Sequence, residues 1–214
     1  MEKKTVSKKQ TAYNRIKDMI LNNQLRPGDS IVEREICESL GVSRTPVRAA
    51  FAELAEEGLV EIIPGRGVFV SRIHFEDMIE IYDIREALEC MSVKLLTERI
   101  TEPDLTALNE IVEWMQRTSG SEFMALDMEL HTTMARCSRN KRLAHEIDQI
   151  YSPIRLVANT AQNDPELRTN ALSEHLDILA AISDRDSARA VEMMRRHILN
   201  VKEYHIKRYF LFTP

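Results

Sequence analysis

The stretch from Val32 to Val70 constrains the fold of this 214-residue chain more than any other. Apolar residues at helical spacing run up to Leu40, and Gly41 then interrupts them, because glycine readily adopts the left-handed conformation that ends a helix. Helical spacing resumes after Ser43 and stops at Gly58, and two short β-type runs follow. The sequence therefore predicts a helix, a turn, a second helix and a β-hairpin.

The first of these two helices is expected to begin near Ser30, because Ser30 and Glu33 have the spacing of a capping box. The second is expected to use Ser43 as its N-cap and to carry Pro46 in its first turn, where a missing amide hydrogen costs little. A supporting helix is predicted at residues 10–22. The buried stripe of the second helix is predicted to be Val47, Ala50, Phe51 and Leu54.

The exposed face at the start of the second helix is predicted to bind DNA. A recognition helix presents its N-terminal side chains to base edges and phosphates in the major groove, and an arginine can bind guanine or phosphate through two parallel donors. Arg66, flanked by glycines at the hairpin tip, is placed to reach a phosphate backbone or a narrow minor groove. A merely solvated helix face and an ordinary surface hairpin are the alternatives. The side chains on the helix are Arg44, Thr45 and Arg48.

Composition divides the chain in two. Five of the six glycines lie at or before Gly67, and all six histidines lie at or after His74. The net charge of −5 is divided into +2 for residues 1–72 and −7 for residues 73–214. A mildly basic module beside an acidic one fits a DNA reader attached to a part that does not touch DNA. We therefore expect two domains, 1–72 and 73–214.

Cysteine usage and hydropathy indicate the cellular compartment in which the protein is expected. Cys37, Cys90 and Cys137 are odd in number and widely spaced, which argues against a disulfide framework and against a zinc ribbon. No apolar run approaches the roughly 18 residues of a membrane span, and the Lys-rich start is not followed by the apolar segment of a signal peptide. We expect a soluble, cytoplasmic protein that does not enter a membrane.

After His74 the β-type signal disappears, and helical periodicity continues to Phe210. The predicted fold class is mostly α, with an N-terminal winged helix-turn-helix that carries a small β-hairpin, and a C-terminal all-α antiparallel bundle of about six helices. These six helices are expected at residues 75–100, 102–118, 121–137, 141–161, 165–183 and 187–210.

Four side chains that commonly bind metals are predicted to point into this bundle from three helices. Leaving them buried without partners would cost about 1–3 kcal/mol each, and one divalent ion could satisfy all four. Plain hydrogen bonds, for example to Ser or Tyr, are the alternative. The remaining histidines, His74, His145 and His205, are not expected to be ligands. The four predicted metal ligands are Asp127, His131, His175 and His197.

Arg85 lies on an apolar stripe of its own helix and is predicted to point into the same cavity, where it could bind an anionic effector. Pairing with Glu86 or Glu89 is an equally good interpretation. A metal-dependent enzyme is disfavoured because Glu129 and Glu174, which are close in sequence to the histidines, are expected to face away. No evident general base would then remain.

These motifs together resemble a known family. The segment PGDSIVEREICESLGVSRTPVRAAFAELAEEGLVEIIPGRGVFV, and residues 10–72 around it, resemble the winged-helix domain of GntR-family bacterial transcription regulators. Val32 departs from the family pattern, in which a cap or a proline is more usual near this point. The DNA contacts that the resemblance implies are Arg34, Arg44, Thr45, Arg48, Gly65 and Arg66.

Residues 75–210 resemble the FCD effector domain of the FadR subgroup of that family, and six helices suit its shorter, VanR-like branch. Metal-binding members carry Asp-x-x-x-His on one helix and one histidine on each of two later helices, which Asp127, His131, His175 and His197 match in order and approximate spacing. An Asp plus three His suits Zn(II), Ni(II), Fe(II), Co(II) or Mn(II).

The resemblance implies a homodimeric repressor that binds double-stranded operator DNA and responds to a small carboxylate effector at this metal site. A regulator that senses the metal ion itself is the main alternative, and a metal-dependent enzyme is a weaker one.

Overall fold

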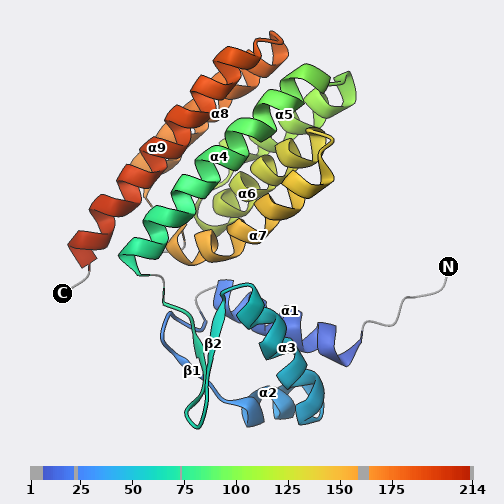
Figure 1. Ribbon diagram of the computed structural model, residues 1–214, viewed down its shortest axis with the longest axis vertical. Coiled ribbons are helices and arrows are strands. Elements are labelled where there is room, and N and C mark those ends of the chain that lie inside the picture. Colours follow the sequence, from blue (N-terminus) through green and yellow to red (C-terminus); the bar gives the residue numbers. More distant parts are fainter. Residues whose placement is uncertain (1–6, 22–23, 73, 159–163, 213–214) are drawn as a thin grey trace, which may run out of the picture. The chain divides into compact units, whose positions relative to one another are not determined.

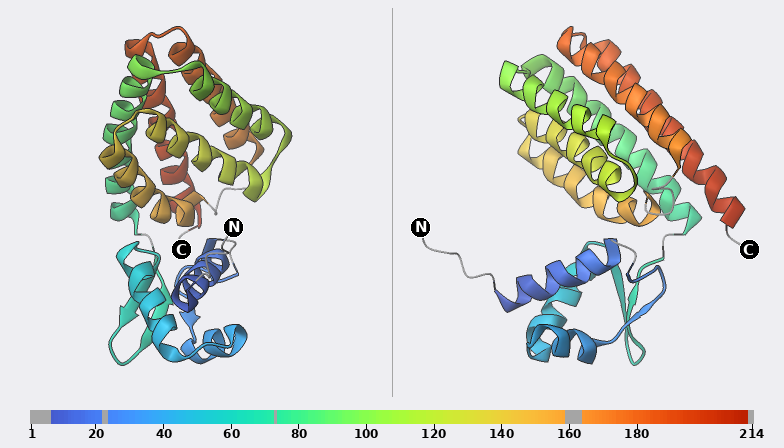
Figure 2. Two further views of the ribbon diagram at one scale, coloured as in Figure 1. Left: turned by 90° about the vertical axis from the view of Figure 1, so that its right-hand side faces the viewer. Right: turned by 180° about the vertical axis from the view of Figure 1, so that it is seen from behind.

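The structure, a computed structural model, describes residues 7–21, 24–72, 74–158 and 164–212. It consists of two compact units, Met1–Ile73 and His74–Pro214, whose elements Figures 1 and 2 show from three directions.

The first unit is a three-helix cluster with a small sheet. Helix α1 packs against α3, and the three strands form an antiparallel sheet in the order β1-β3-β2. Ser30 of β1 pairs with Phe69 of β3, and Val60 of β2 pairs with Val70 of β3. The elements are α1 (Lys8–Leu21), β1 (Ser30–Ile31), α2 (Glu33–Leu40), α3 (Arg44–Glu56), β2 (Val60–Ile63) and β3 (Gly67–Val70).

The core of this unit follows the predicted apolar stripes. Burying such a stripe is the main stabilising contribution for a short helix, because an isolated helix of this length is marginal in water. The predicted stripe of α3 is confirmed. The residues that α1 and α3 bury are Ala12, Tyr13, Ile16, Ile20, Val47, Ala50, Phe51 and Leu54.

The predicted start of α2 at Ser30 is wrong. Ser30 lies in strand β1, and α2 begins at Glu33 with Val32 as its N-cap, which makes no side-chain capping bond. The pairing of Ser30 and Ile31 with β3, a non-local interaction, overrides the local preference that the capping-box spacing indicates. The sheet therefore has a third strand that the sequence did not predict.

The turn between α2 and α3 is as predicted. Gly41 has φ of 62°, and its amide donates to the carbonyls of Cys37 and Glu38. Ser43 is the N-cap of α3 in extended conformation, but its hydroxyl makes no capping bond within the described residues. The left-handed glycine, rather than a side-chain cap, sets the angle at which α3 leaves α2.

The second unit is all α. Helix α4 is central, since α6, α7, α8 and α9 all contact it, and α5 packs against α6 and α8 (Figure 2). None of the described helices is long and apolar enough to cross a membrane. The helices are α4 (Phe75–Arg99), α5 (Glu102–Arg117), α6 (Gly120–Cys137), α7 (Lys141–Ala158), α8 (Pro165–Ser183) and α9 (Ser187–Phe212).

The six predicted helices are confirmed within a few residues, and the predicted end of the fourth at Ala161 lies outside the described residues. Thr101 caps α5 through a reciprocal capping box with Asp104, and the Asp164 carboxylate accepts from two amides at the start of α8. Polar caps at these breaks explain why the boundaries were readable from sequence.

Candidate functional site

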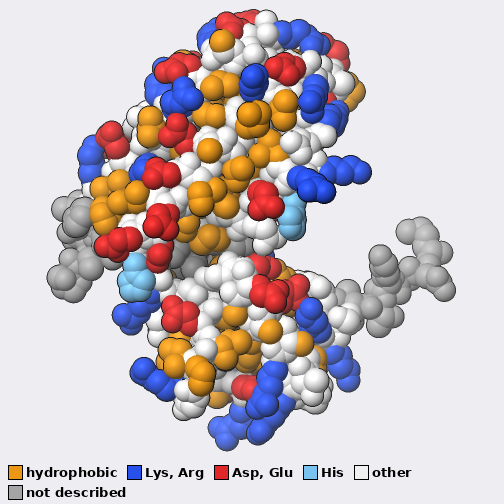
Figure 3. All heavy atoms as spheres, in the orientation of Figure 1, with side chains coloured by type: hydrophobic (Ala, Val, Ile, Leu, Met, Phe, Trp, Pro, Cys, Tyr) orange, Lys and Arg blue, Asp and Glu red, His pale blue; other side chains and the backbone are white. Residues whose placement is uncertain are grey.

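The side chains predicted to contact DNA are exposed on three elements of the first unit. Arg34 lies in the first turn of α2, and Arg44, Thr45 and Arg48 lie at the start of α3. The remaining two form the tip between β2 and β3, where Gly65 has φ of 72°. Figure 3 shows Lys and Arg side chains gathered at the lower end of this unit. All six are exposed and lie in one unit, and their contacts with DNA stay a prediction.

Both arginines of α3 pair with one carboxylate that the sequence did not single out. Arg48 Nε donates to Glu33 Oε2 at 2.8 Å, and Arg44 Nε lies 3.6 Å from Glu33 Oε1. The hydrogen bond to Glu33 raises the pKa of Arg48. Glu33 is on α2, so this contact crosses the helix-turn-helix.

The three predicted histidine ligands converge in the second unit. His131 on α6, His175 on α8 and His197 on α9 are each at most 1% exposed. Each offers a nitrogen within 4.8 Å of the others. The Nε2 atoms of His131 and His175 are 3.3 Å apart, and Asp127 Oδ1 lies 3.5 Å from His175 Nε2. The fourth predicted ligand is therefore adjacent to the histidine cluster.

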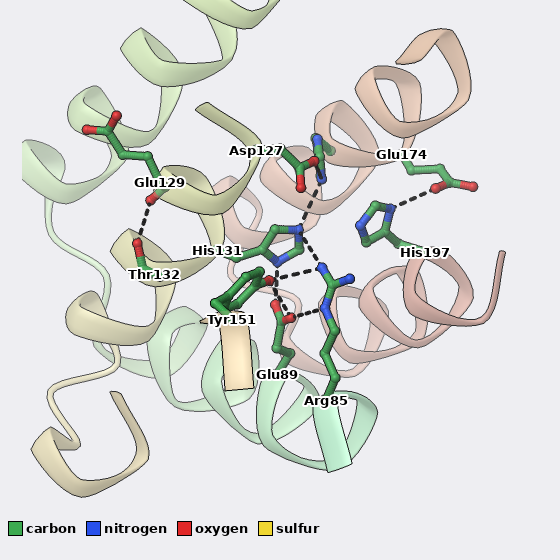
Figure 4. A network of polar contacts seen from close by, with 10 residues as sticks. Arg85, Glu89, Asp127, Glu129, His131, Thr132, Tyr151, Glu174 and His197 are labelled. Atoms are coloured by element: carbon green, nitrogen blue, oxygen red, sulfur yellow. Dashed lines mark hydrogen bonds and ion pairs between the residues drawn. The ribbon is translucent and has the colours of Figure 1, made fainter. Parts of the chain in front are cut away.

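A buried polar network orients His131 (Figure 4). Glu89 accepts from His131 Nδ1, from Arg85 Nε at 2.6 Å and from the Tyr151 hydroxyl at 2.7 Å. Arg85 Nη2 also donates to the Tyr151 hydroxyl at 2.9 Å and lies 3.3 Å from His131 Nε2. Burial would raise the pKa of Glu89, but His131 and Arg85 outweigh it and hold that pKa well below its usual range. Arg85 therefore pairs with Glu89, as one interpretation had it, and it also faces the histidines, while its binding of an anionic effector stays a prediction.

The expectation that Glu174 faces away is wrong. Its Oε2 accepts from His197 Nδ1 at 2.8 Å (Figure 4). Its Oε1 accepts from Asn200 at 2.5 Å. Glu174 precedes His175 on α8 and so points towards α9 rather than into the cluster. Glu129 is exposed, as predicted. Two of the three histidines thus have a carboxylate on Nδ1.

Carboxylates on Nδ1 leave Nε2 of both rings directed at the centre of the cluster, an arrangement that is common for histidines that bind metals. His197 Nε2 and His175 Nδ1 are buried and have no hydrogen-bond partner among the described residues. Burial, reinforced by the neighbouring histidines, lowers the pKa of His175, and burial also lowers that of His197. The lowered pKa values favour the neutral form of His175 and His197, which is the form that coordinates a metal.

The donor set fits a divalent ion. Two nitrogens bound to one ion at about 2.0–2.1 Å across a tetrahedral angle lie roughly 3.3 Å apart, which matches the observed separation of His131 Nε2 and His175 Nε2. His197 Nε2 offers a buried lone pair that no described residue uses. When bound, an ion at this point would supply a Lewis-acidic position for a carboxylate or water.

A small cavity of about 30 Å³ adjoins the cluster. Arg85, Asp127 and Tyr82 line it, together with His205, which stacks on Tyr82 with ring centroids 6.0 Å apart. His205, which was not expected to be a metal ligand, is 3% exposed. Its position eight residues after His197, on the same face of α9, was the signal in the sequence.

A helix-turn-helix followed by a β-hairpin, joined in one chain to a helical bundle, is an arrangement typical of DNA-binding transcription regulators. Residues 8–70 match the family described as "Bacterial regulatory proteins, gntR family", and residues 80–200 match the FCD domain. The chain therefore belongs to the GntR family of transcription regulators, in its FadR-like subfamily with an FCD domain.

Individual relatives agree with this assignment. The HTH-type transcriptional repressor RspR of Escherichia coli strain K12 is 28% identical over 201 residues, which cover 91% of this chain and 87% of that protein. The uncharacterised HTH-type transcriptional regulator YdhC of Bacillus subtilis is 27% identical over 192 residues, which cover 87% of this chain and 84% of that protein. These relatives are transcription regulators, not enzymes.

Solved structures share the fold. E. coli McbR/YncC superimposes with a TM-score of 0.83 at 24% identity, covering 96% of this chain and all of that one. A GntR regulator from Rhodococcus sp. RHA1 gives the same TM-score and identity, covering 94% of this chain and 98% of that one.

His205 generates a prediction about pH. Burial, with Arg85 and Arg208 nearby, lowers the pKa of His205 to about 4, whereas an unfolded histidine titrates near pH 6.5. The unfolded chain therefore binds the proton first, and stability is lost as the pH falls below about 6.5. At pH 5 the lowered pKa of His205 should reduce the free energy of unfolding by about 2 kcal/mol. The measurement is urea unfolding of the wild type and of His205→Phe at pH 7 and pH 5. The decline in the free energy of unfolding between these two pH values is expected to be smaller in His205→Phe by the part that His205 contributes.

The matched control is His145→Phe, because the ring of His145 is exposed on α7. This variant should keep the decline of the wild type. Equal declines for the wild type and His205→Phe would show that His205 does not contribute to the pH dependence.

Proposed function

We propose that this regulator is a cytoplasmic repressor whose operator affinity is controlled by a small organic acid bound at a metal-containing cavity in the second unit. The observation that carries the proposal is the buried cluster of three histidines with the Arg85 guanidinium 3.3 Å from one of them. A cation site beside a buried arginine suits a carboxylate. The name of RspR as a repressor supports the sign of regulation.

In this proposal residues 1–72 bind operator DNA and residues 73–214 bind the effector. An effector changes DNA affinity only if it binds one arrangement of the protein more tightly than another. The proposed DNA contacts are Arg34, Arg44, Thr45, Arg48, Gly65 and Arg66.

Replacing either Arg44 or Arg48 by Ala should weaken binding to a duplex selected by the wild type from a randomised library, by about tenfold or more, because each loses a bidentate contact to a base or phosphate. The measurement is fluorescence anisotropy at fixed, moderate salt. Arg142→Ala, an exposed arginine of α7, is the control and should bind normally. Unchanged binding by both α3 variants would remove the recognition-helix assignment.

The proposed ion ligands are Asp127, His131, His175 and His197, and the ion is one of Zn, Ni, Fe, Co or Mn. Elemental analysis of purified protein should find about one divalent ion per chain. His175→Ala should lose it, while His145→Ala should retain it. A stable wild type that never takes up an ion would refute the metal site.

The carboxylate proposal depends on Arg85 and on a coordination position left open by the four protein ligands. In a thermal-shift screen with metal measured on the same sample, one organic acid should raise the melting temperature by a few degrees. Its uncharged amide should not, because it offers no charge to Arg85. Equal shifts for acid and amide would argue against carboxylate recognition.

The size of the cavity favours metal sensing as a second candidate function. Pockets for small organic ligands usually measure about 300–1,000 Å³, whereas about 30 Å³ suits only one or two waters. An organic acid would require Met124 and Met128, flexible side chains that line the cavity, to move. If DNA affinity depends on the ion and not on any organic acid, this outcome would favour metal sensing over recognition of an acid.

We also propose a homodimer, and α4 offers a surface for it. Ile84 and Met91 are 52% and 46% exposed, and exposed Ala87 lies between them. Figure 3 shows hydrophobic side chains gathered along this face of the unit. A twofold axis at Ala87 would set Glu80 of one copy opposite Lys94 of the other, since each lies seven residues away. The surface is therefore self-complementary in charge as well as apolar.

Ala87→Arg should convert the dimer to a monomer near 24.7 kDa in sedimentation equilibrium, because two buried like charges would meet at the axis. Trp114→Arg is the control, since Trp114 is 58% exposed on α5. An Ala87→Arg protein that still sediments as a dimer would place the interface elsewhere.

A further inference from the structure

Glu33 is in contact with both arginines at the start of α3, one at each carboxylate oxygen. Arg48 Nε donates to Oε2 at 2.8 Å, and Arg44 Nε lies 3.6 Å from Oε1. The three side chains differ in exposure, since Glu33 is 26% exposed, Arg44 72% and Arg48 64%. The carboxylate thus lies beneath two guanidinium groups that extend into solvent.

The choice of nitrogen matters for recognition. A guanidinium group is planar and carries five N–H donors in a fixed fork. When Nε is held by a carboxylate, both terminal nitrogens remain available as the parallel pair that binds guanine O6 and N7 or a phosphate. Glu33 therefore leaves the recognising end of each arginine available and restrains the stem. An unrestrained arginine would lose more side-chain entropy on binding.

We propose that Glu33 is a positioning residue that determines sequence discrimination, by holding Arg44 and Arg48 in the orientation that reads base edges. This inference rests on the proposed DNA contacts of these arginines. Its negative charge has a second effect, since it lowers the attraction of this surface for any phosphate backbone, irrespective of sequence. The first effect increases the ratio of specific to non-specific affinity, whereas the second weakens both affinities alike.

The contact is exposed, and exposed ion pairs contribute little to folding. Replacing Glu33 is therefore expected to leave thermal unfolding unchanged, so that its effect on DNA binding can be measured separately. Glu35 provides a matched control, because it lies in the same first turn of α2, is exposed and makes no ion pair with a described residue.

The experiment compares full-length variants on two probes at one salt concentration. The first probe is the duplex that the wild type selects from a randomised library, and the second is a scrambled duplex of equal length. Glu33→Ala should lower the ratio of the two affinities about tenfold, within the range for a bidentate base contact. Glu33→Gln should retain part of the ratio, because its amide oxygen can still accept from one arginine. Glu35→Ala should strengthen binding to both probes alike and leave the ratio unchanged.

An unchanged ratio in Glu33→Ala, or equal ratios in Glu33→Ala and Glu35→Ala, would overturn the inference and leave the proposed function standing. A wild type that selects no sequence would instead overturn the proposed function, and this inference with it. Circular dichroism melting identifies a folding defect in Glu33→Ala, in which case the comparison of Glu33→Gln with Glu35→Gln decides by the same criterion.

Discussion

Three imidazole rings buried against one another inside an apolar bundle need polar partners, and much of the second unit is arranged to provide them. Burying a polar group without a hydrogen bond costs free energy, and this cost is large compared with the small net stability of a domain. Glu89 of α4 satisfies His131, and Glu174 of α8 satisfies His197. These contacts link α4, α6, α8 and α9 through their least exposed surfaces. The cluster therefore constrains the packing of four helices, and its convergent nitrogens are the basis of the proposed metal site.

Helical periodicity and caps were sufficient to predict most of the fold, because both are local. Residues three and four apart share a helix face whatever lies across from them. The error at Ser30 shows where local information ends. A serine three residues before a glutamate has the spacing of a capping box, yet Ser30 and Ile31 pair with β3, nearly 40 residues later. Strand pairing is a property of two distant segments, so the sequence of one segment does not determine it.

The candidate site, like the fold, was predictable where local information is sufficient. Spacing placed His131, His175 and His197 inward, because an inward residue needs only its own helix to be identified. It did not place Glu174, because the direction of a side chain on the flank of α8 matters only once α9 lies beside it. His205 was missed for a similar reason. Its neighbours on α9 are mixed in polarity, and its burial depends on the side chains of α4 that it meets, including Tyr82.

The same contact, an arginine Nε against a glutamate oxygen, occurs in both units with different consequences. The side chains of Arg85 and Glu89 are 2–3% exposed, and removing either one would leave an uncompensated buried charge. Between Arg48 and Glu33 the contact is largely exposed, so water and salt weaken it. The buried pair can thus hold a fixed framework around the histidines, whereas the exposed pair leaves the terminal nitrogens of Arg48 accessible to a phosphate or a base. Exposure, rather than the chemistry of the pair, separates a contact that holds a core together from one that can orient an arginine for a ligand.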